Sequence, residues 1–348
     1  MKKFLLRLSV IWEAIHGFVF GILATILIIL CSIGIVHNLL KINELSGKYT
    51  GPYKTLVKIA ETTLLNVYEQ GSGAETVLIM SGYGVQSPVL FYKDLATKLN
   101  NAGYRVIIVE SLGYGFSTSA KDERTNAKIV TEMHTALVEK GIVGPYILMP
   151  HSISNVYAIK FFNKYPDEVS KIVSIDGILP NMLNESAYER DLSDQRVNTV
   201  LTSIAGITGF ERIMSYTNPE KFYINYMKDN PVYTMDDIIL YRAQIAVNYL
   251  NNSMVKEQNK LIDNLKEYKD YKYPEYLQVV QIITSETEEK YKDKVANEGY
   301  TNDYVYYAEK MMTNSSLQRI EKVKGEHMLP ITNPSKIVEA MNEEYKTF

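Results

Sequence analysis

The chain has 348 residues, of which 46% are apolar and 22% charged, and its formal net charge is −3. This ordinary globular composition excludes wholesale disorder, and a weakly acidic balance without a basic stripe argues against a nucleic-acid partner. The single cysteine, Cys31, lies within the longest apolar run, which excludes a disulfide framework within the chain and a cysteine-based metal site.

That apolar run, residues 17–36, contains no charged side chain. At about 1.5 Å per residue, a helix of this length crosses the roughly 30 Å hydrocarbon core of a bilayer. A cleaved signal peptide would have a shorter apolar region, of about 7–15 residues, and a small-residue cleavage site. A lipoprotein would need a small residue where Leu30 precedes Cys31. We therefore predict an uncleaved membrane anchor and its linker over residues 1–48.

Basic residues flank the predicted span unequally. Lys2, Lys3 and Arg7 precede it, whereas Lys41 and Lys48 follow it. Because basic residues accumulate on the cytoplasmic side, this small excess favours a cytoplasmic N-terminus in a single-pass protein of the cell membrane. The rest of the chain is then expected on the extracytoplasmic side.

From about residue 49 onward, short apolar runs alternate with segments of helical periodicity. The predicted strands cover residues 76–82, 105–111, 146–151, 171–177, 277–285 and 317–323. Segments between them, such as 89–103 and 124–141, have 3.6-residue apolar spacing and end at glycine. This alternation predicts an α/β fold with a mostly parallel, doubly wound sheet over residues 49–348. Ligands of such sheets bind at the carboxyl ends of the strands.

One segment, residues 179–274, has no strand-like run and is predicted to form a helical cap over the strand ends. Its expected helices cover about 186–208, 219–228 and 235–268. Tyr, Met and Ile recur along them at helical spacing, which is more typical of the core of the cap than of a substrate lining.

Ser152 directly follows the predicted strand 146–151 and precedes the helical segment that begins "ISNVYAIKFF". A sharp strand-to-helix turn of this kind, a nucleophile elbow, lifts the serine hydroxyl above the sheet at a helix N-terminus. Small residues are expected two positions before and after the serine, and here Pro150 and Ser154 occupy those positions. The alternative is that Ser152 is only a helix N-cap.

A histidine near the C-terminus, His327, strengthens the elbow interpretation. The other four are His16 and His37 beside the apolar run, His134 within a helix, and His151, whose side chain is expected to point away from Ser152. His327 follows the last predicted strand and lies in a loop before a closing helix. This position suits a general base toward Ser152.

The third member of a catalytic triad should be an acid between the serine and the histidine in chain order. Glu288, counted from the end of the strand 277–285, is the first choice, Glu286 is its competitor and Asp176 is a third possibility. For an oxyanion hole, the backbone N–H groups of Ile153 and Tyr83 are the expected donors, the latter in the glycine-rich loop "MSGYGVQSP".

Five motifs in this order resemble the α/β-hydrolase fold superfamily over most of residues 49–348. They are "MSGYG", "VESLGYGFS" with Glu110 in place of an aspartate, "MPHSIS", "YPDEVSKIVSID" and "GEHMLPITNP". The resemblance implies a Ser-His-acid triad, a helical cap and no cofactor or metal. It is nearest to membrane-anchored or exported bacterial members of undefined substrate.

The leading functional hypothesis is a serine hydrolase that works through an acyl-enzyme. The expected small-molecule substrate is a small or lipophilic ester, by analogy with the fold and because the cap is apolar. An aminopeptidase-type or thioester hydrolase of the same fold is an alternative, and a catalytically inactive, membrane-tethered binding protein is another. The second expected partner is the lipid bilayer, through residues 17–36.

Overall fold

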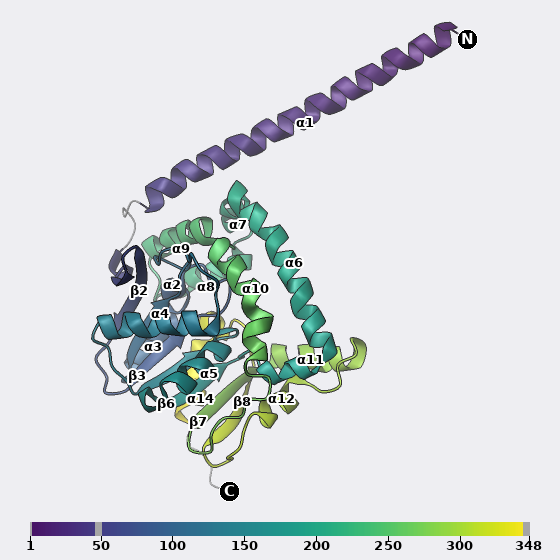
Figure 1. Ribbon diagram of the computed structural model, residues 1–348. Coiled ribbons are helices and arrows are strands. Elements are labelled where there is room, and N and C mark those ends of the chain that lie inside the picture. Colours follow the sequence, from purple (N-terminus) through teal and green to yellow (C-terminus); the bar gives the residue numbers. More distant parts are fainter. Residues whose placement is uncertain (1, 46–50, 344–348) are drawn as a thin grey trace.

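Figure 1 shows the computed structural model of the chain, which describes residues 2–45 and 51–343. A long N-terminal helix extends from a body in which a central sheet has helices on both faces and further helices over one end. Lys48, and with it the predicted boundary between anchor and body, lies outside the described residues.

The predicted mostly parallel sheet is confirmed. Its eight strands lie in the order β1-β2-β4-β3-β5-β6-β7-β8, and every neighbouring pair from β4 to β8 is parallel. The strands are β1 (Leu56–Ala60), β2 (Thr63–Gln70), β3 (Thr76–Met80), β4 (Arg105–Glu110), β5 (Tyr146–Pro150), β6 (Val169–Ile175), β7 (Gln278–Thr284) and β8 (Gln318–Val323). The carboxyl ends of the parallel strands therefore meet along one edge of the sheet.

β1 and β2 lie outside the predicted set of strands. They form an antiparallel pair at one edge of the sheet, and β2 also runs antiparallel to β4. β1 is short and alternates exposed with half-buried residues, so it lacks the continuous apolar run that marks the central parallel strands. In β2, Leu65 and Val67 are buried in the core.

The helices cover the two faces of the sheet separately. α3 (Lys93–Asn101) and α14 (Pro334–Asn342) contact each other on one face, and α4 (Asn126–Glu139) and α5 (Ser154–Lys164) contact each other on the other. The helix predicted over 89–103 is interrupted at Tyr92, before which the short α2 (Pro88–Phe91) forms.

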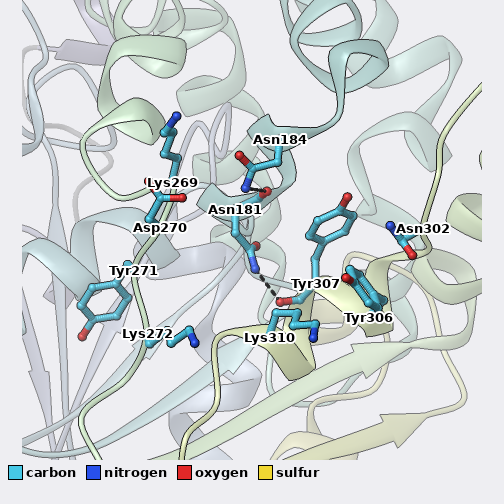
Figure 2. Close-up of a pocket in the computed structure, with 10 residues that line it drawn as sticks. All are labelled: Asn181, Asn184, Lys269, Asp270, Tyr271, Lys272, Asn302, Tyr306, Tyr307 and Lys310. Carbon is cyan, nitrogen blue, oxygen red and sulfur yellow. Dashed lines mark hydrogen bonds between the residues drawn. The ribbon is translucent and has the colours of Figure 1, made fainter.

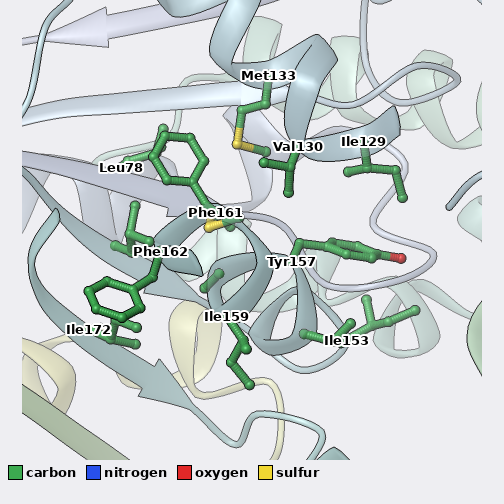
Figure 3. Close-up of a cluster of buried hydrophobic side chains, with 14 of the residues drawn as sticks. Leu78, Ile129, Val130, Met133, Ile153, Tyr157, Ile159, Phe161, Phe162 and Ile172 are labelled. Atoms are coloured by element: carbon green, nitrogen blue, oxygen red, sulfur yellow. The ribbon is translucent and has the colours of Figure 1, made fainter. Parts of the chain in front are cut away.

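The core around α5 shows how the segment after Ser152 is held (Figure 3). Phe161 and Phe162 of α5, with Leu78 of β3 and Ile172 of β6, belong to one buried cluster that Met133 of α4 also joins. Burial of two phenylalanines contributes about 1.5–3 kcal/mol each to stability. This packing fixes α5 and therefore the turn that precedes it.

Between β6 and β7, the described chain forms only helices and turns. The α-helices are α6 (Ser186–Thr208), α7 (Phe210–Thr217), α8 (Ile224–Asp229), α9 (Met235–Asn248) and α10 (Asn252–Lys266). The single helix predicted over 235–268 is divided because Leu250 has a φ of 38° and Asn251 caps α10, accepting hydrogen bonds from the backbone N–H groups of Ser253 and Met254. α7 was not predicted as a separate helix.

The carboxylate of Glu257 in α10 ties this helical cap to the body. It accepts hydrogen bonds from the hydroxyl groups of Tyr114, which follows β4, and of Tyr157 in α5, at 2.7 and 2.8 Å. Burial raises the pKa of Glu257. Tyr83 adds a third link, because its hydroxyl donates to the backbone oxygen of Met254 at 3.2 Å.

The N-terminal helix α1 (Lys2–Leu45) includes a segment, Trp12–Lys41, that is long and apolar enough to cross a membrane by length and composition. Its large apolar side chains are exposed. Near its C-terminal end, α1 contacts α6 and α9 of the cap. Lys41 Nζ donates to the backbone oxygen of Val247 at 3.0 Å, and His37 is buried.

Candidate active site

Ser152 lies in a tight turn between β5 and α5. Its backbone φ is 57°, a left-handed conformation that residues other than glycine rarely adopt. The turn is held on both sides, because the Ser152 N–H donates to Ile175 at 3.0 Å and the Ser152 carbonyl accepts from Ile178 at 2.9 Å. A non-glycine residue kept in this region by its surroundings is a feature of functional sites.

The two residues that replace the expected glycines fit this turn for different reasons. Pro150 is the last residue of β5, paired with Met80, so its missing N–H falls at the end of the ladder. Ser154 is buried, and its hydroxyl lies 2.7 Å from the Met80 carbonyl and accepts the His151 N–H at 2.9 Å. Ser154 therefore adds a hydrogen-bonded link between β3 and the turn.

His327 lies in the loop after β8, and its Nδ1 atom is 3.3 Å from Oδ2 of Asp176. Asp176 directly follows β6, is buried and has a φ of 42°. Its carboxylate also accepts hydrogen bonds from the Thr284 N–H at 2.8 Å and from the hydroxyl groups of Thr284 and Thr287. Asp176 is thus held in place while one oxygen faces the histidine.

The structure brings Asp176, and not Glu288, to the side chain of His327. Glu288 lies in α11 (Ser285–Asn297), and its carboxylate accepts hydrogen bonds from Lys292 and Lys322 at 2.7 and 2.8 Å. Glu286 reaches the histidine loop through the backbone, because its carboxylate accepts the His327 N–H at 2.5 Å. Of the three acids considered from the sequence, only Asp176 contacts the imidazole ring among the described residues.

Ser152, Asp176 and His327 line one cavity of about 640 Å³ at the carboxyl edge of the sheet. Among the described residues, no hydrogen bond joins the Ser152 hydroxyl to His327. In structures without a bound substrate, such catalytic hydrogen bonds are often long or poorly aligned. With Nδ1 directed at Asp176, Nε2 is the ring nitrogen of His327 left for a partner across the cavity.

The rest of the cavity wall is largely polar. It includes Asp191, Asp194, Gln195 and Asn198 of α6, Glu286, Lys290 and Lys294 of α11, and the tyrosines 188, 223, 291 and 304. The expectation that Tyr, Met and Ile of the cap form its core holds for Ile224, Met227 and Tyr241, which are buried, but Tyr223 lines the cavity.

The predicted oxyanion-hole donors occupy suitable backbone positions. Ile153 directly precedes α5, and Tyr83 lies in the loop after β3 between Gly82 and Gly84. Within the described part of the chain, the backbone N–H groups of Tyr83 and Ile153 have no hydrogen-bond acceptor. Unpaired N–H groups at these positions are available to an oxyanion.

Known proteins share this fold. The family model for the alpha/beta hydrolase fold matches residues 75–201, which include β3 to β6 and the turn at Ser152. An esterase from Exiguobacterium antarcticum has a similar structure, with a TM-score of 0.53 at 14% identity over 83% of this chain and 97% of that one. The chain belongs to the α/β-hydrolase fold superfamily.

Two sequence relatives extend the comparison. The uncharacterized protein YbdG of Bacillus subtilis strain 168 is 28% identical over 253 residues, which are 72% of this chain and 74% of that protein. The 2-hydroxy-6-oxononadienedioate/2-hydroxy-6-oxononatrienedioate hydrolase of Escherichia coli K12 is 25% identical over 130 residues, which are 37% of this chain and 45% of the hydrolase. The second match thus spans less than half of either protein.

Around this candidate site, Tyr92 and His151 form a buried network that the sequence does not predict. The Gly82 N–H donates to the Tyr92 hydroxyl at 3.0 Å, and that hydroxyl lies 2.9 Å from His151 Nδ1. On the other side of the ring, Nε2 lies 3.0 Å from the backbone oxygen of His327. The network therefore joins the loop after β3, the turn at Ser152 and the loop that contains His327.

Burial, together with the smaller effect of the neighbouring His327, lowers the pKa of His151 to about 3, so the ring is neutral at pH 7. A neutral imidazole has one donor and one acceptor nitrogen. Since the carbonyl of His327 can only accept, Nε2 carries the hydrogen and Nδ1 accepts from Tyr92. The His151 side chain thus contacts Tyr92 and the backbone of His327. Tyr92 had no motif to mark it.

Glu110, which replaces the aspartate of the family motif, is buried at the end of β4. Its carboxylate accepts from the backbone N–H groups of Val89 and Phe116 and from Asn66 Nδ2, at 3.1, 2.7 and 3.0 Å. Burial raises its pKa to about 7, against these hydrogen bonds, which favour the charged form. Glu110 therefore links β2, α2 and the loop that follows β4.

A second depression, of about 330 Å³, lies apart from the predicted site residues (Figure 2). Asn181, Tyr307 and three lysines contribute to its wall, and Asn181 Nδ2 donates to the Tyr307 carbonyl at 2.8 Å. None of the predicted catalytic or oxyanion-hole residues lines it.

Proposed function

We propose that this protein is a serine hydrolase of short, polar esters, with Ser152, His327 and Asp176 as its triad. One observation carries the proposal: Ser152 and His327 line the same cavity, and the imidazole is held by the carboxylate of Asp176. The preference from sequence spacing for Glu288, with Glu286 as alternative, is revised to Asp176, because only the latter contacts the ring.

In the proposed reaction, Ser152 Oγ attacks the ester carbonyl carbon while His327 Nε2 accepts its proton. Asp176 accepts the Nδ1 hydrogen and stabilises the imidazolium that forms. The N–H groups of Tyr83 and Ile153 would bind the oxyanion, and each such donor is worth about 10²–10³ in kcat. His327 then returns the proton to the leaving alcohol, and water attacks the acyl-enzyme by the same route.

The polar cavity wall is the reason to propose a polar rather than a lipophilic substrate. Asp191, Asp194, Gln195 and Lys290 line the same cavity as Ser152. A long alkyl chain there would remove water from charged groups without replacing their hydrogen bonds, which is costly. A short acyl group with a polar substituent would suit the same wall.

We also propose that α1 anchors the enzyme in the cell membrane, with the hydrolase body on the extracytoplasmic side. Support comes from the exposed apolar segment Trp12–Lys41 and from the excess of basic residues before it. A signal peptide meets the same criteria of length and composition, so the size of the N-terminus in the mature protein distinguishes the two.

A fluorophosphonate probe tests the proposed chemistry on the full-length protein in membranes. Wild type and the control variant Ser154→Ala should be labelled, and Ser152→Ala should not. Labelling that survives Ser152→Ala, or a wild type that is never labelled, overturns the hydrolase and favours an inactive binding protein. Turnover of acetyl, octanoyl, thioester and aminoacyl substrates then separates the esterase from the thioester and aminopeptidase alternatives.

A further inference from the structure

The short helix α7 of the cap exposes one apolar side. Phe210, Ile213 and Tyr216 are 49%, 43% and 62% exposed. Their spacing of three residues places all three within one side of the helix. Clustered apolar residues of this kind, unlike scattered ones, mark surfaces that contact a partner or a membrane.

This side of α7 begins where α1 contacts the cap. Gly209, between α6 and α7, has a φ of 78°, and a Cβ atom there would lie 2.6 Å from Cβ of His37. His37 itself is only 3% exposed. A glycine at this corner therefore lets α1 pass directly against the start of α7 (Figure 1).

The contact comes at a defined depth along α1. His37 directly follows the apolar run 17–36, and Lys41, which bonds to the cap, comes one turn later. One turn is about 5.4 Å, which is close to the thickness of the headgroup layer on each side of the hydrocarbon core. If 17–36 cross the core, the corner at Gly209 lies at the level of the headgroups.

The chemistry next to α7 suits this layer. The Arg242 guanidinium of α9 stacks on the Tyr216 ring, with 4.3 Å between the guanidinium carbon and the ring centroid. Ile239 lies nearly one turn before Arg242 in α9 and is also exposed. Tyrosine and arginine combine apolar bodies with polar ends, and both concentrate where hydrocarbon meets water.

We propose that the apolar side of α7, with Ile239 of α9, inserts into the interfacial layer of the bilayer that α1 crosses. The inference rests on the proposed membrane anchor and adds a second point of membrane contact. With two contacts, the cap has a fixed orientation on the membrane. α6 then connects the membrane to the active site, since its C-terminal end adjoins Gly209 and its earlier residues Asp191, Gln195 and Asn198 line the cavity.

The experiment uses the full-length protein in vesicles of phosphatidylcholine and phosphatidylglycerol that carry doxyl quenchers at a shallow or a deep acyl position. A bimane label on Cys31, the natural cysteine within the apolar run, reports the anchor. In a Cys31→Ser background, Ile213→Cys reports α7. Val143→Cys is the control, because Val143 is 73% exposed and precedes the amino end of β5, at the opposite edge of the sheet.

We expect deep quenching of the Cys31 label, shallow quenching of the Ile213→Cys label and no quenching of the Val143→Cys label. If the Cys31 label is quenched but the Ile213→Cys label matches the Val143→Cys control, the anchor stands and the docking of α7 is wrong. Protection of the Ile213→Cys label without lipid quenching would point to a second copy of the chain instead. An unquenched Cys31 label overturns the anchor and the inference together.

Discussion

The Nδ1 atom of His327 lies 3.3 Å from Oδ2 of Asp176, although the two residues follow strands that are not neighbours. Asp176 follows β6 and His327 follows β8, and β7 lies between these strands. The contact passes over the end of β7, where Thr284 also donates hydrogen bonds to the same carboxylate. The carboxylate of Asp176 is therefore held by Thr284 at the end of β7, the strand that separates Asp176 from His327.

Replacement of Asp176 by asparagine should reduce kcat for a short ester by about 10³–10⁴-fold, because an amide cannot hold the reactive tautomer of His327 or stabilise its charge. Glu288→Gln is the matched control, since it removes an acid bonded to two lysines near the surface, and it should retain wild-type turnover. Steady-state kinetics on both variants provide the test. A loss with Glu288→Gln that equals the loss with Asp176→Asn would return the acid role to α11.

Tyr92→Phe should lower both stability and turnover. It removes the hydroxyl that links Gly82 to His151, which leaves two buried polar groups unpaired at a cost of about 1–3 kcal/mol each. Turnover should fall as well, because Gly82 precedes the proposed oxyanion donor. Tyr146→Phe removes a comparable buried bond, to Ile142, at the other end of β5. The control should lose stability alone, so equal kcat values for the two variants would contradict a positioning role for Tyr92.

Ser154→Ala should destabilise the protein by about 1 kcal/mol and leave catalysis nearly intact. The variant loses the hydroxyl bond to Met80, whereas alanine remains small enough for the turn. Ser154→Val adds volume at a buried position and should cost about 1–3 kcal/mol more, with a loss of turnover. Urea unfolding in detergent and ester kinetics measure the two effects. A valine variant as active as wild type would show that the turn does not require a small residue here.

The pH dependence of stability should carry the signature of His151. Its pKa is lowered to about 3 in the folded protein, mainly by burial, against about 6.5 when unfolded. Between these values only the unfolded state binds the proton, so this group's contribution to stability is complete above pH 6.5 and declines as the pH falls toward 3. The slope is about 1.4 kcal/mol per pH unit for one proton.

The comparison with His151→Gln isolates this contribution from the carboxylates that titrate in the same range. Tyr92, His327 and Asp176 are the titratable groups that act on His151 or bond to it, and all remain in the variant. The difference in free energy of unfolding between wild type and variant should shrink as the pH falls from 6.5 to 4. A constant difference over that interval would mean that His151 is not buried neutral.

The fold is largely predictable because the parallel strands from β3 to β7 are mostly buried on both faces and contain continuous apolar runs. β1 escapes prediction because it is short and half-exposed, so no such run marks it. In the cap, the break between α9 and α10 depends on a left-handed Leu250 and on the cap at Asn251, within a segment of uninterrupted helical periodicity. Local conformation, rather than the apolar pattern, decides that boundary.

For the site, chain order points to Ser152 and His327 as candidates, because each is tied to the end of one strand. The acidic partner of His327 is harder to predict. Counting residues from the end of β7 cannot show that Asp176, which follows β6, reaches the side chain of His327. The role of Tyr92 is harder still to predict. This residue lies between α2 and α3, and its contact with His151 has no local sequence pattern. The long-range contacts of the site therefore come from the structure.

Because the proposed acid, Asp176, directly follows β6, α11 has no proposed role in proton transfer, yet it forms one wall of the cavity through Glu286, Lys290 and Lys294. Substitutions along that helix can alter what the pocket admits while the reacting groups stay in place. The proposed reacting groups and this part of the cavity wall therefore lie on different elements, so catalysis and substrate selectivity can change separately in evolution. Homologues could therefore diverge in substrate along α11 without passing through an inactive ancestor.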